Sequence, residues 1–150
     1  MADIHFRTAT AADVPEVVAL LADDVLGAGR EGTDMAPYLV AFAAMQAESA
    51  NQLIVGEMAG EIIATYQITF ISGLSLKAAR RALVESVRVA AALRSRGIGA
   101  RLMADAETRA RAAGCTLIQL TSNASRSDAR RFYERLGFAP SHTGFKKPLG

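Results

Sequence analysis

The most informative segment of the chain is Val87-Arg88-Val89, followed after four residues by Arg94-Ser95-Arg96-Gly97-Ile98-Gly99-Ala100. It predicts a strand that leads into a short loop, and the loop opens directly into a helix over 97–113 whose apolar residues form one stripe. Gly97 and Gly99 allow the backbone to approach a ligand closely because they carry no side chain. The first N–H groups of a helix have no partner inside it and lie at the positive end of its dipole. The segment therefore predicts a phosphate site.

The charges beside this loop favour the same interpretation. Arg94 and Arg96 stand where a helix normally prefers acidic residues, and an anion bound between them would resolve that conflict. A glycine-rich turn before a helix is often only a turn, so the spacing by itself leaves both interpretations open. The loop matches neither G-x-x-x-x-G-K-[ST] nor G-x-G-x-x-G, which disfavours P-loop and dinucleotide-binding proteins.

The remainder of the chain predicts an α/β domain with a mixed sheet and helices on both faces. Thr10 and Asp13 form a capping-box pattern at the start of the first helix, and Ala59-Gly60 forms a two-residue hairpin turn. Residues 25–34 are expected to form a loop or a broken helix, and residues 72–79 a loop. The expected strands are 4–7, 53–58, 61–70, 82–89, 117–121 and a strand pair from Phe138 onward, and the expected helices are 11–23, 35–48, 97–113 and 128–136.

Composition excludes several classes of protein. The 150 residues are 51% hydrophobic, which fits one domain over 1–150 with a substantial core. A net charge of +2 does not favour a nucleic-acid partner. Cys115 is the only cysteine, and the two histidines, His5 and His142, are far apart, so neither a disulfide nor a metal site is expected. No secretory signal or membrane span is seen, and we expect a cytoplasmic protein.

Two motifs resemble one known family. Arg94-x-x-Gly97-x-Gly99-Ala100 resembles the R/Q-x-x-G-x-G/A signature of the GCN5-related N-acetyltransferases (GNAT), and residues 129–138 resemble their A-x-x-F-Y-x-x-x-G-F segment. The resemblance implies a mostly antiparallel sheet of about seven strands, splayed between the fourth and fifth. It also implies that acetyl-CoA is bound, without a metal. The implied cofactor-binding residues are Val87, Arg88, Val89, Arg94, Ser95, Arg96, Gly97, Ile98, Gly99, Ala100, Asn123 and Arg130.

The resemblance also assigns catalytic roles. Tyr133 matches the family tyrosine that donates a proton to the departing thiolate, and a phenol is protonated at neutral pH. Glu85 is a candidate base, acting through water, because a carboxylate in an apolar strand needs a task or a partner. A salt bridge to Arg81 or Arg88, or a solvent-facing edge, is the equal alternative, and a bulge could turn Glu85 away. Strand 82–89 is expected to place Leu83, Glu85, Val87 and Val89 on one face.

The implied reaction is direct attack of a small primary amine on acetyl-CoA in a ternary complex, with a backbone N–H of Val87 or Val89 stabilising the oxyanion. Asn123 is either a pantetheine ligand or a turn residue. Acidic residues of the segment 23–34 could hold a cationic amine. A protein or peptide N-acetyltransferase and a non-catalytic CoA-binding sensor remain as alternatives. We also expect a homodimer, because the late strands of the family often contribute to one.

Overall fold

A computed structural model describes residues 3–23 and 29–150. In this part of the chain one sheet has five strands in the order β1-β2-β3-β4-β5. The first four strands are antiparallel neighbours, and β5 runs parallel to β4. The strands are β1 (His5–Thr8), β2 (Asn51–Met58), β3 (Glu61–Ile71), β4 (Arg81–Val89) and β5 (Leu117–Leu120).

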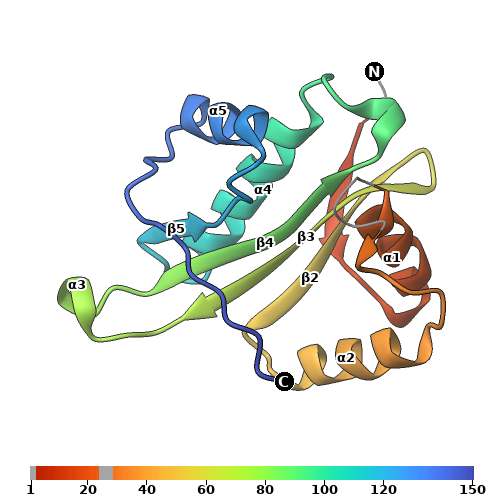
Figure 1. The fold of residues 1–150 in the computed structure, drawn as a ribbon, viewed down its shortest axis with the longest axis horizontal. Helices are drawn as coiled ribbons and strands as arrows, with labels where there is room; N and C mark the ends of the chain where they lie inside the picture. Colours follow the sequence, from red (N-terminus) through yellow and green to blue (C-terminus); the bar gives the residue numbers. More distant parts are fainter. Residues whose placement is uncertain (1–2, 24–28) are drawn as a thin grey trace.

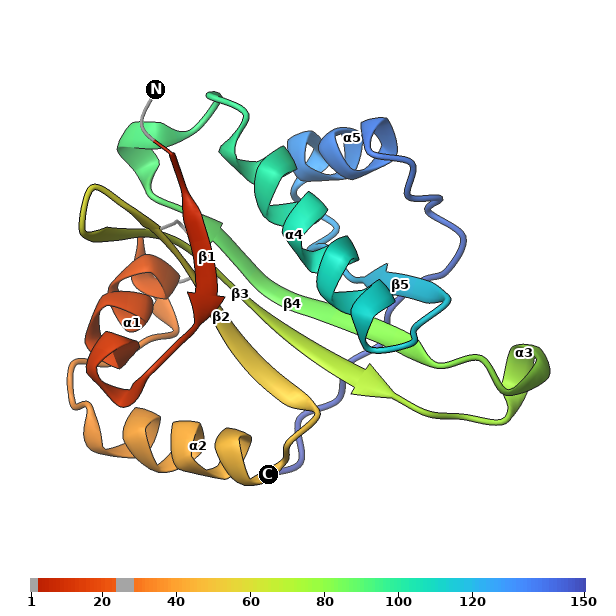
Figure 2. The same cartoon turned by 180° about the vertical axis from the view of Figure 1, so that it is seen from behind.

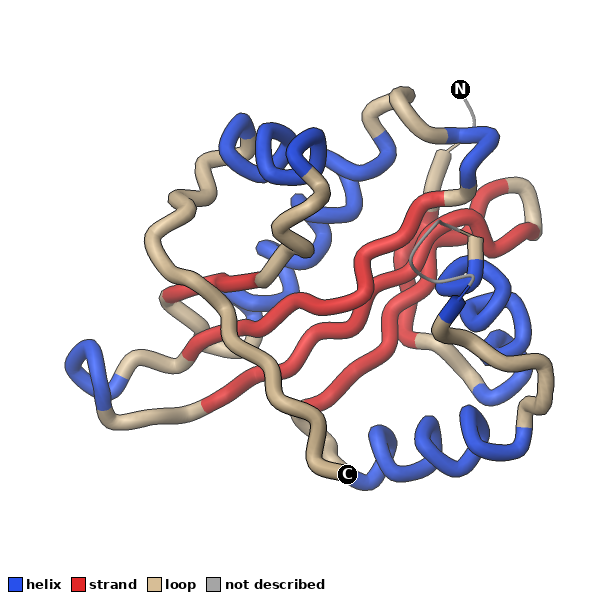
Figure 3. The backbone as a smooth tube through the Cα atoms, viewed as in Figure 1, coloured by secondary structure: helices blue, strands red, loops and turns tan. Residues whose placement is uncertain are grey.

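The expected count of about seven strands is wrong for the described residues, and the strand pair expected from Phe138 onward does not form. Beyond Gly137 the chain is extended but belongs to no strand, as Figure 3 shows by its tan colour. The only backbone hydrogen bond within 139–150 that the described residues show joins Ser141 N–H to Ala139 O. This segment forms no ladder of backbone hydrogen bonds with a strand in the described structure, and such pairing is what defines a strand.

Four helices cover the two faces of the sheet. Helices α1 (Val14–Ala22) and α2 (Ala36–Ala47) lie on one face, as Figure 1 shows, and α4 (Ile98–Ala112) and α5 (Ser127–Arg135) lie toward the other, which Figure 2 shows from behind. The predicted helices and hairpin are confirmed within a few residues at their ends. The expected loop 72–79 contains a short turn, α3 (Ser75–Ala78), and short 3-10 turns occur at η1 (Ala11–Asp13) and η3 (Ala91–Leu93).

Each face of the sheet has its own core. Ile98, Leu102, Ala106 and Ala110 are buried, which confirms the predicted apolar stripe of α4. They pack with Tyr66 and Ile68 of β3. On the opposite face α1 and α2 contribute a smaller core whose buried members are Ala9, Val14, Val17, Val18, Phe42 and Val55.

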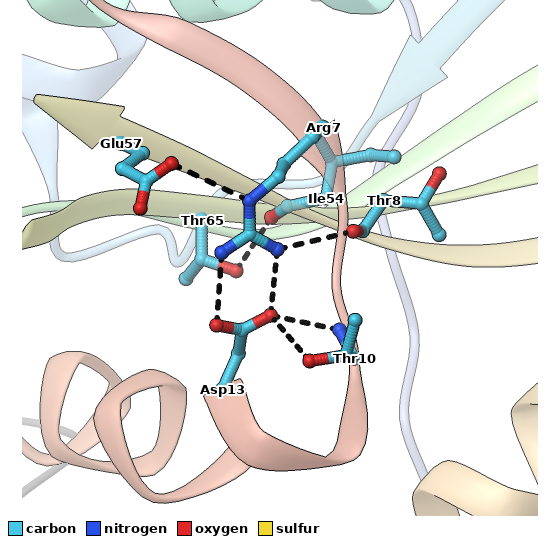
Figure 4. A network of polar contacts seen from close by, with 7 residues as sticks. All are labelled: Arg7, Thr8, Thr10, Asp13, Ile54, Glu57 and Thr65. Carbon is cyan, nitrogen blue, oxygen red and sulfur yellow. Dashed lines mark hydrogen bonds and ion pairs between the residues drawn. The ribbon is translucent and has the colours of Figure 1, made fainter. Parts of the chain in front are cut away.

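The first strand is joined to the first helix by a carboxylate, as Figure 4 shows. Arg7 donates to both oxygens of Asp13 over 2.7 and 3.0 Å. The Thr10 N–H donates to the same carboxylate over 2.8 Å. The capping box predicted from Thr10 and Asp13 is therefore present, with Arg7 as an additional partner that sequence spacing did not indicate.

A β-bulge in β4 corrects the predicted faces of that strand. Thr65 pairs with Arg88 and Gln67 with Glu85, so two residues of β4 lie opposite one residue of β3. Ser86 adopts a φ of +55° at this point. The extra residue reverses the alternation, so that Glu85 and Arg88 share a face while Val89 shares the opposite face with Val84. Periodicity of two could not reveal this, since it assumes an unbroken ladder.

Candidate active site

The site is built where β4 and β5 separate. β5 pairs with β4 only over Arg81–Val84, so β4 continues from Glu85 to Val89 without β5 beside it. Ala90 N–H donates to Ile63 O over 2.8 Å, on the β3 side. Because N–H groups alternate in direction along a strand, those of Val87 and Val89 point to the opposite, open edge. This edge can accept an extended ligand or donate to an oxyanion.

The loop after β4 opens α4 as the sequence predicted. Ser95 and Gly97 have φ values of +64° and +79°, and the first hydrogen bond inside α4 runs from Arg101 N–H to Gly97 O over 3.2 Å. The N–H groups of Ile98, Gly99 and Ala100 therefore have no partner within the helix, and no side chain caps them in the described structure. They lie at the positive end of a 15-residue helix, where an anion is stabilised.

The two glycines of this loop are required for different reasons. Gly97 has a positive φ and nothing within 4 Å of the place where a Cβ would lie. Its role is conformational, because the left-handed region is costly for other residues. At Gly99 a Cβ would lie 3.1 Å from Cζ of Phe132, so this glycine lets α5 pack closely against α4. Packing against Phe132 is therefore a second reason for glycine at position 99, in addition to the predicted close approach of a ligand.

The two loop arginines also differ. Arg94 donates from Nε to Val89 O over 3.2 Å and from Nη2 to Asp23 O over 2.9 Å. It thereby joins the end of β4 to the end of α1. Arg96 is exposed and lies one residue before Gly97. Of the two, Arg96 has the side chain better placed to meet an anion, since Arg94 is engaged by backbone carbonyls.

Tyr133, the predicted proton donor, lies partly buried among aromatic rings. Its ring contacts Phe132 and Phe138, with centroid distances of 5.1 and 5.8 Å. It packs against the same core cluster as Val87 and Val89. Burial raises the pKa of the Tyr133 phenol, and the charges of Arg126 and Arg88 partly offset that rise. The group therefore remains protonated at neutral pH.

Glu85 lies on the face of the sheet that carries α1 and α2. It is exposed, and its register partner on β3 is Gln67. Within the described residues no ion pair joins Glu85 to Arg81 or Arg88, so the salt bridge is not supported, whereas the exposure of Glu85 agrees with the solvent-facing alternative. The bulge at Ser86 sets the direction of Glu85 relative to Val87. Its role as a base through water stays a prediction.

Two other predicted cofactor residues have local partners. The Asn123 amide oxygen accepts the N–H of Ser125 over 2.9 Å and its hydroxyl over 2.6 Å, which is the geometry of a turn residue. Its amide NH₂ remains able to donate to a ligand. Arg130 pairs with Glu134 over 2.9 Å on the exposed side of α5. Such an exposed pair is weak and can be exchanged for a phosphate.

Arg126 is a residue that the sequence patterns above did not single out. It is the residue before α5, and its charge acts on Tyr133 together with that of Arg88. The sequence does contain an indication of this residue, because Arg126 places a positive charge at the positive end of a helix dipole. The same unfavourable placement singled out Arg94 and Arg96. The conflict is visible only when the start of α5 is placed at Ser127 rather than Asp128.

The acidic segment expected to hold an amine is only partly described. Asp24 and residues 25–28 lie outside the described residues. Tyr38 donates to Glu31 over 2.9 Å, and Asp34 accepts the N–H of Ala36 over 3.1 Å. Both carboxylates therefore have structural partners. Asp23 lines an open hollow with Glu16, Leu20 and Ile62, beside the bond that its backbone accepts from Arg94.

The described chain shows no sign of two other kinds of site. Over 3–23 and 29–150, no helix has the length and apolar character that crossing a bilayer requires. In the same residues no three histidine, cysteine or acidic side chains form a group suited to a metal ion.

Comparison with known proteins gives one family match and similar solved structures, of which two are informative. A model described as the acetyltransferase (GNAT) family matches residues 18–138, which include both motifs. The crystal structure of a transcriptional regulator from Bacillus halodurans C-125 has a TM-score of 0.94 at 41% identity, covering 98% of this chain and 100% of that chain. A putative acetyltransferase from Agrobacterium tumefaciens C58 has a TM-score of 0.86 at 27% identity, covering 97% and 99%.

A curated relative matches over a shorter stretch. The aminoalkylphosphonate N-acetyltransferase of Salmonella typhimurium is 42% identical over 66 residues, which are 44% of this chain and 43% of that protein. The chain therefore matches less than half the length of that relative.

Proposed function

Because the chain belongs to the GNAT acetyltransferase family, as its two motifs predicted, we propose that it transfers an acetyl group from acetyl-CoA to a primary amine of a small molecule. The family and the acetyltransferase names of its relatives support an acetyl-CoA-dependent N-acetyltransferase. Two features of the structure, which occur together, carry the proposal. One is the edge of β4 that has no strand beside it, and the other is the set of N–H groups at the start of α4 that have no partner in the helix.

The residues present fit acetyl-CoA in two places. The N–H groups of Ile98, Gly99 and Ala100 are suited to its diphosphate, with Arg96 and Ser95 beside them. The edge formed by Val87, Arg88 and Val89 is suited to the amide groups of its pantetheine arm. In this proposal Asn123 contributes its amide NH₂ to that arm, and Arg130 meets the 3′-phosphate after releasing Glu134.

Acetyl-CoA supplies an activated acetyl group, and the chain supplies proton transfer and charge stabilisation. The Glu85 carboxylate accepts, through a bound water, the proton that the attacking amine must lose. The N–H of Val87 or Val89 donates to the oxyanion of the tetrahedral intermediate. The Tyr133 hydroxyl, whose pKa is raised by burial, donates its proton to the departing sulfur.

The acceptor that we favour carries a negative charge as well as the amine. Arg88 and Arg126 are the two charged residues that act on the Tyr133 phenol, and both are cationic. A relative is named as an aminoalkylphosphonate N-acetyltransferase, and such a substrate combines an amine with an anionic group. We therefore extend that chemical class, an amine bearing a phosphonate, phosphate or carboxylate, to this chain.

The test is release of free thiol from acetyl-CoA with acceptors matched in length. We expect 2-aminoethylphosphonate and its phosphate analogue to be used with a kcat/KM roughly tenfold or more above that of ethanolamine, a difference typical of one charge-assisted contact. Tyr133→Phe should lower kcat by about 10²–10³-fold, in the range of general acid catalysis, while acetyl-CoA affinity stays within about twofold.

A second tyrosine provides the matched control. Tyr66 is buried and donates to Asp105, which also accepts from Arg109. Tyr66→Phe should lower the unfolding free energy by about 1–3 kcal/mol and leave kcat nearly unchanged. Loss of turnover in both variants, or in neither, would remove Tyr133 from the proposed mechanism.

A non-catalytic CoA-binding sensor is the second candidate, because a relative that covers nearly the whole chain is named a transcriptional regulator. In that case acetyl-CoA should bind, no acceptor should release thiol, and Tyr133→Phe should change nothing. We also propose that the chain acts as a homodimer, which needs a surface able to join two copies.

A further inference from the structure

A chain of three polar side chains leads across the sheet to the candidate base, Glu85. The side-chain NH₂ of Gln67 donates to Asn51 Oδ1 over 2.9 Å, and the NH₂ of Asn51 donates to Glu48 Oε2 over 2.9 Å. Glu48 follows the last residue of α2, Asn51 begins β2, and Gln67 lies on β3, the strand between β2 and β4 (Figure 1). The chain therefore connects the end of α2 to the strand beside Glu85.

The carboxylate at one end sets the direction of both amides. An ionised carboxylate only accepts hydrogen bonds, so Asn51 turns its NH₂ toward Glu48 and its oxygen toward Gln67. Gln67 then donates with its own NH₂, which leaves its oxygen, Oε1, at the other end of the chain. The orientation of the Gln67 amide is therefore fixed by its neighbours.

Gln67 Oε1 and the Glu85 carboxylate are two hydrogen-bond acceptors on one face of the sheet. The two residues are register partners on antiparallel strands, and the Cβ atoms of such partners lie about 4.5–5.5 Å apart. Among the described residues, neither Gln67 Oε1 nor the Glu85 carboxylate has a hydrogen-bond partner, and neither is buried away from solvent. Such a pair suits a small molecule that donates to both.

Water is the donor that fits this pair, because one water can give a hydrogen to each oxygen. Its lone pairs then face away from both residues. We propose that Gln67 is a positioning residue for proton removal, whose oxygen orients the water through which Glu85 acts; this inference rests on the proposed function. The substrate ammonium gives a proton to the water oxygen while the water gives one of its own to Glu85. The lone pair left on the substrate nitrogen attacks the acetyl carbonyl.

The first test removes the oxygen of Gln67 and keeps the length of the side chain. Held by Glu85 alone, the water can turn a hydrogen toward the amine, and it then cannot accept the proton. Gln67→Met should therefore lower kcat with 2-aminoethylphosphonate by roughly five- to tenfold, the loss of one hydrogen bond, while the KM for acetyl-CoA stays within about twofold.

A double-variant cycle tests whether Gln67 acts through the same water as Glu85. In a Glu85→Gln background the water has no base to serve, so its orientation no longer limits the reaction. Adding Gln67→Met to that background should lower kcat by less than about twofold. A purely structural effect of Gln67→Met would instead be added in full.

Substitutions at Asn51 separate positioning from structural support. Asn51→Leu removes the oxygen that holds the Gln67 NH₂, so the Gln67 amide can rotate and kcat should fall roughly three- to tenfold. The double variant Glu48→Gln/Asn51→Asp exchanges the amide and the carboxylate at the same net charge. The amide introduced at position 48 donates to the carboxylate introduced at position 51, which still accepts from Gln67. This variant should keep kcat within about twofold of the wild type.

Thr69→Val is the matched control. The Thr69 hydroxyl donates to the same Asn51 oxygen over 3.4 Å, but it does not determine which way the Gln67 amide faces. Thr69→Val should leave kcat within about twofold of the wild type, since a hydrogen bond of that length is weak. Thermal unfolding followed by circular dichroism shows that each variant is folded.

Three results would overturn this proposal: an unchanged kcat in Gln67→Met, an equal loss from Gln67→Met in the Glu85→Gln background, or a Glu48→Gln/Asn51→Asp variant as impaired as Asn51→Leu. Each result is measured against an active wild type, so the role of Gln67 can fail while the proposed acetyl transfer stands. A wild type that releases no thiol with any amine would overturn both.

Discussion

At the scale of single residues, Asp13 shows how one carboxylate stabilises the N-terminal part of the fold. Its side chain is only 10% exposed, and it accepts from Arg7 and from Thr10. The hydrogen bonds from Arg7 are the main reason that the pKa of Asp13 falls from 3.8 to about 2. Folding therefore favours the ionised form of this group.

This shift predicts a specific acid sensitivity. As the pH falls, Asp13 becomes protonated at a higher pH in the unfolded chain than in the folded chain. The stability that ionised Asp13 contributes is therefore complete above about pH 4 and is lost as the pH falls toward about 2. We expect about 2 kcal/mol of unfolding free energy to be lost in this window. Urea unfolding across the pH range measures it.

Asp13→Asn is the control for this prediction, because the amide cannot titrate. The variant should be less stable at neutral pH and should lose less additional stability between about pH 4 and pH 2. An unchanged slope in the variant would assign the acid sensitivity to other carboxylates.

At the scale of elements, the close packing of α4 against α5 connects the phosphate loop to the proposed catalytic tyrosine. Gly99 of α4 faces the ring of Phe132, and Tyr133 is the next residue of α5. A side chain at position 99 therefore acts on the proposed proton donor through packing. Gly97 is two residues away but acts only through its own backbone.

Alanine substitutions should separate the two glycines. Gly99→Ala places a Cβ 3.1 Å from Phe132, so kcat should fall about tenfold as α5 moves. Phe132→Leu should restore much of that loss, because leucine is shorter. Gly97→Ala should cost about 1–2 kcal/mol of backbone strain and raise the KM for acetyl-CoA.

Phe132→Leu distinguishes the two glycine variants. Phe132→Leu should not restore Gly97→Ala, since nothing lies within 4 Å of the Cβ position there. Steady-state kinetics of the single and double variants, with Phe132→Leu alone as a reference, measure both effects. Rescue of both glycine variants would contradict the packing role assigned to Gly99.

At the scale of the whole molecule, ligand binding should stabilise the fold because the proposed site joins β4, α4 and α5. Acetyl-CoA at about a hundred times its dissociation constant should add about 2.7 kcal/mol of stability. For a chain of this size that corresponds to a rise in Tm of about 5–10 °C. Differential scanning fluorimetry measures it without any acceptor.

Two comparisons assign this stabilisation to the diphosphate. Acetyl-pantetheine, which lacks the diphosphate, should give little or no rise in Tm. Arg96→Gln should reduce the rise with acetyl-CoA, whereas Arg135→Gln, at the far end of α5, should not. An equal rise with acetyl-pantetheine would exclude the start of α4 as the anion site.

Local patterns in the sequence were sufficient for most of the elements. The apolar stripe of α4, the turn at Ala59-Gly60 and the capping pair at Thr10 and Asp13 depend on residues close in the chain. The family resemblance rested on two such local motifs. For these features the necessary information lies within a few turns of backbone, so spacing alone predicts them.

Tertiary structure decided the features that depend on distant neighbours. The bulge at Ser86 depends on pairing with β3, and the need for glycine at position 99 comes from Phe132, which belongs to a different helix. The segment after Gly137 has a strand-like sequence but pairs with no strand in the described structure. Sequence by itself determined which segments become helices and most of the strands, whereas the fold determined which partners those segments meet, because pairing and packing join residues that the chain order keeps apart.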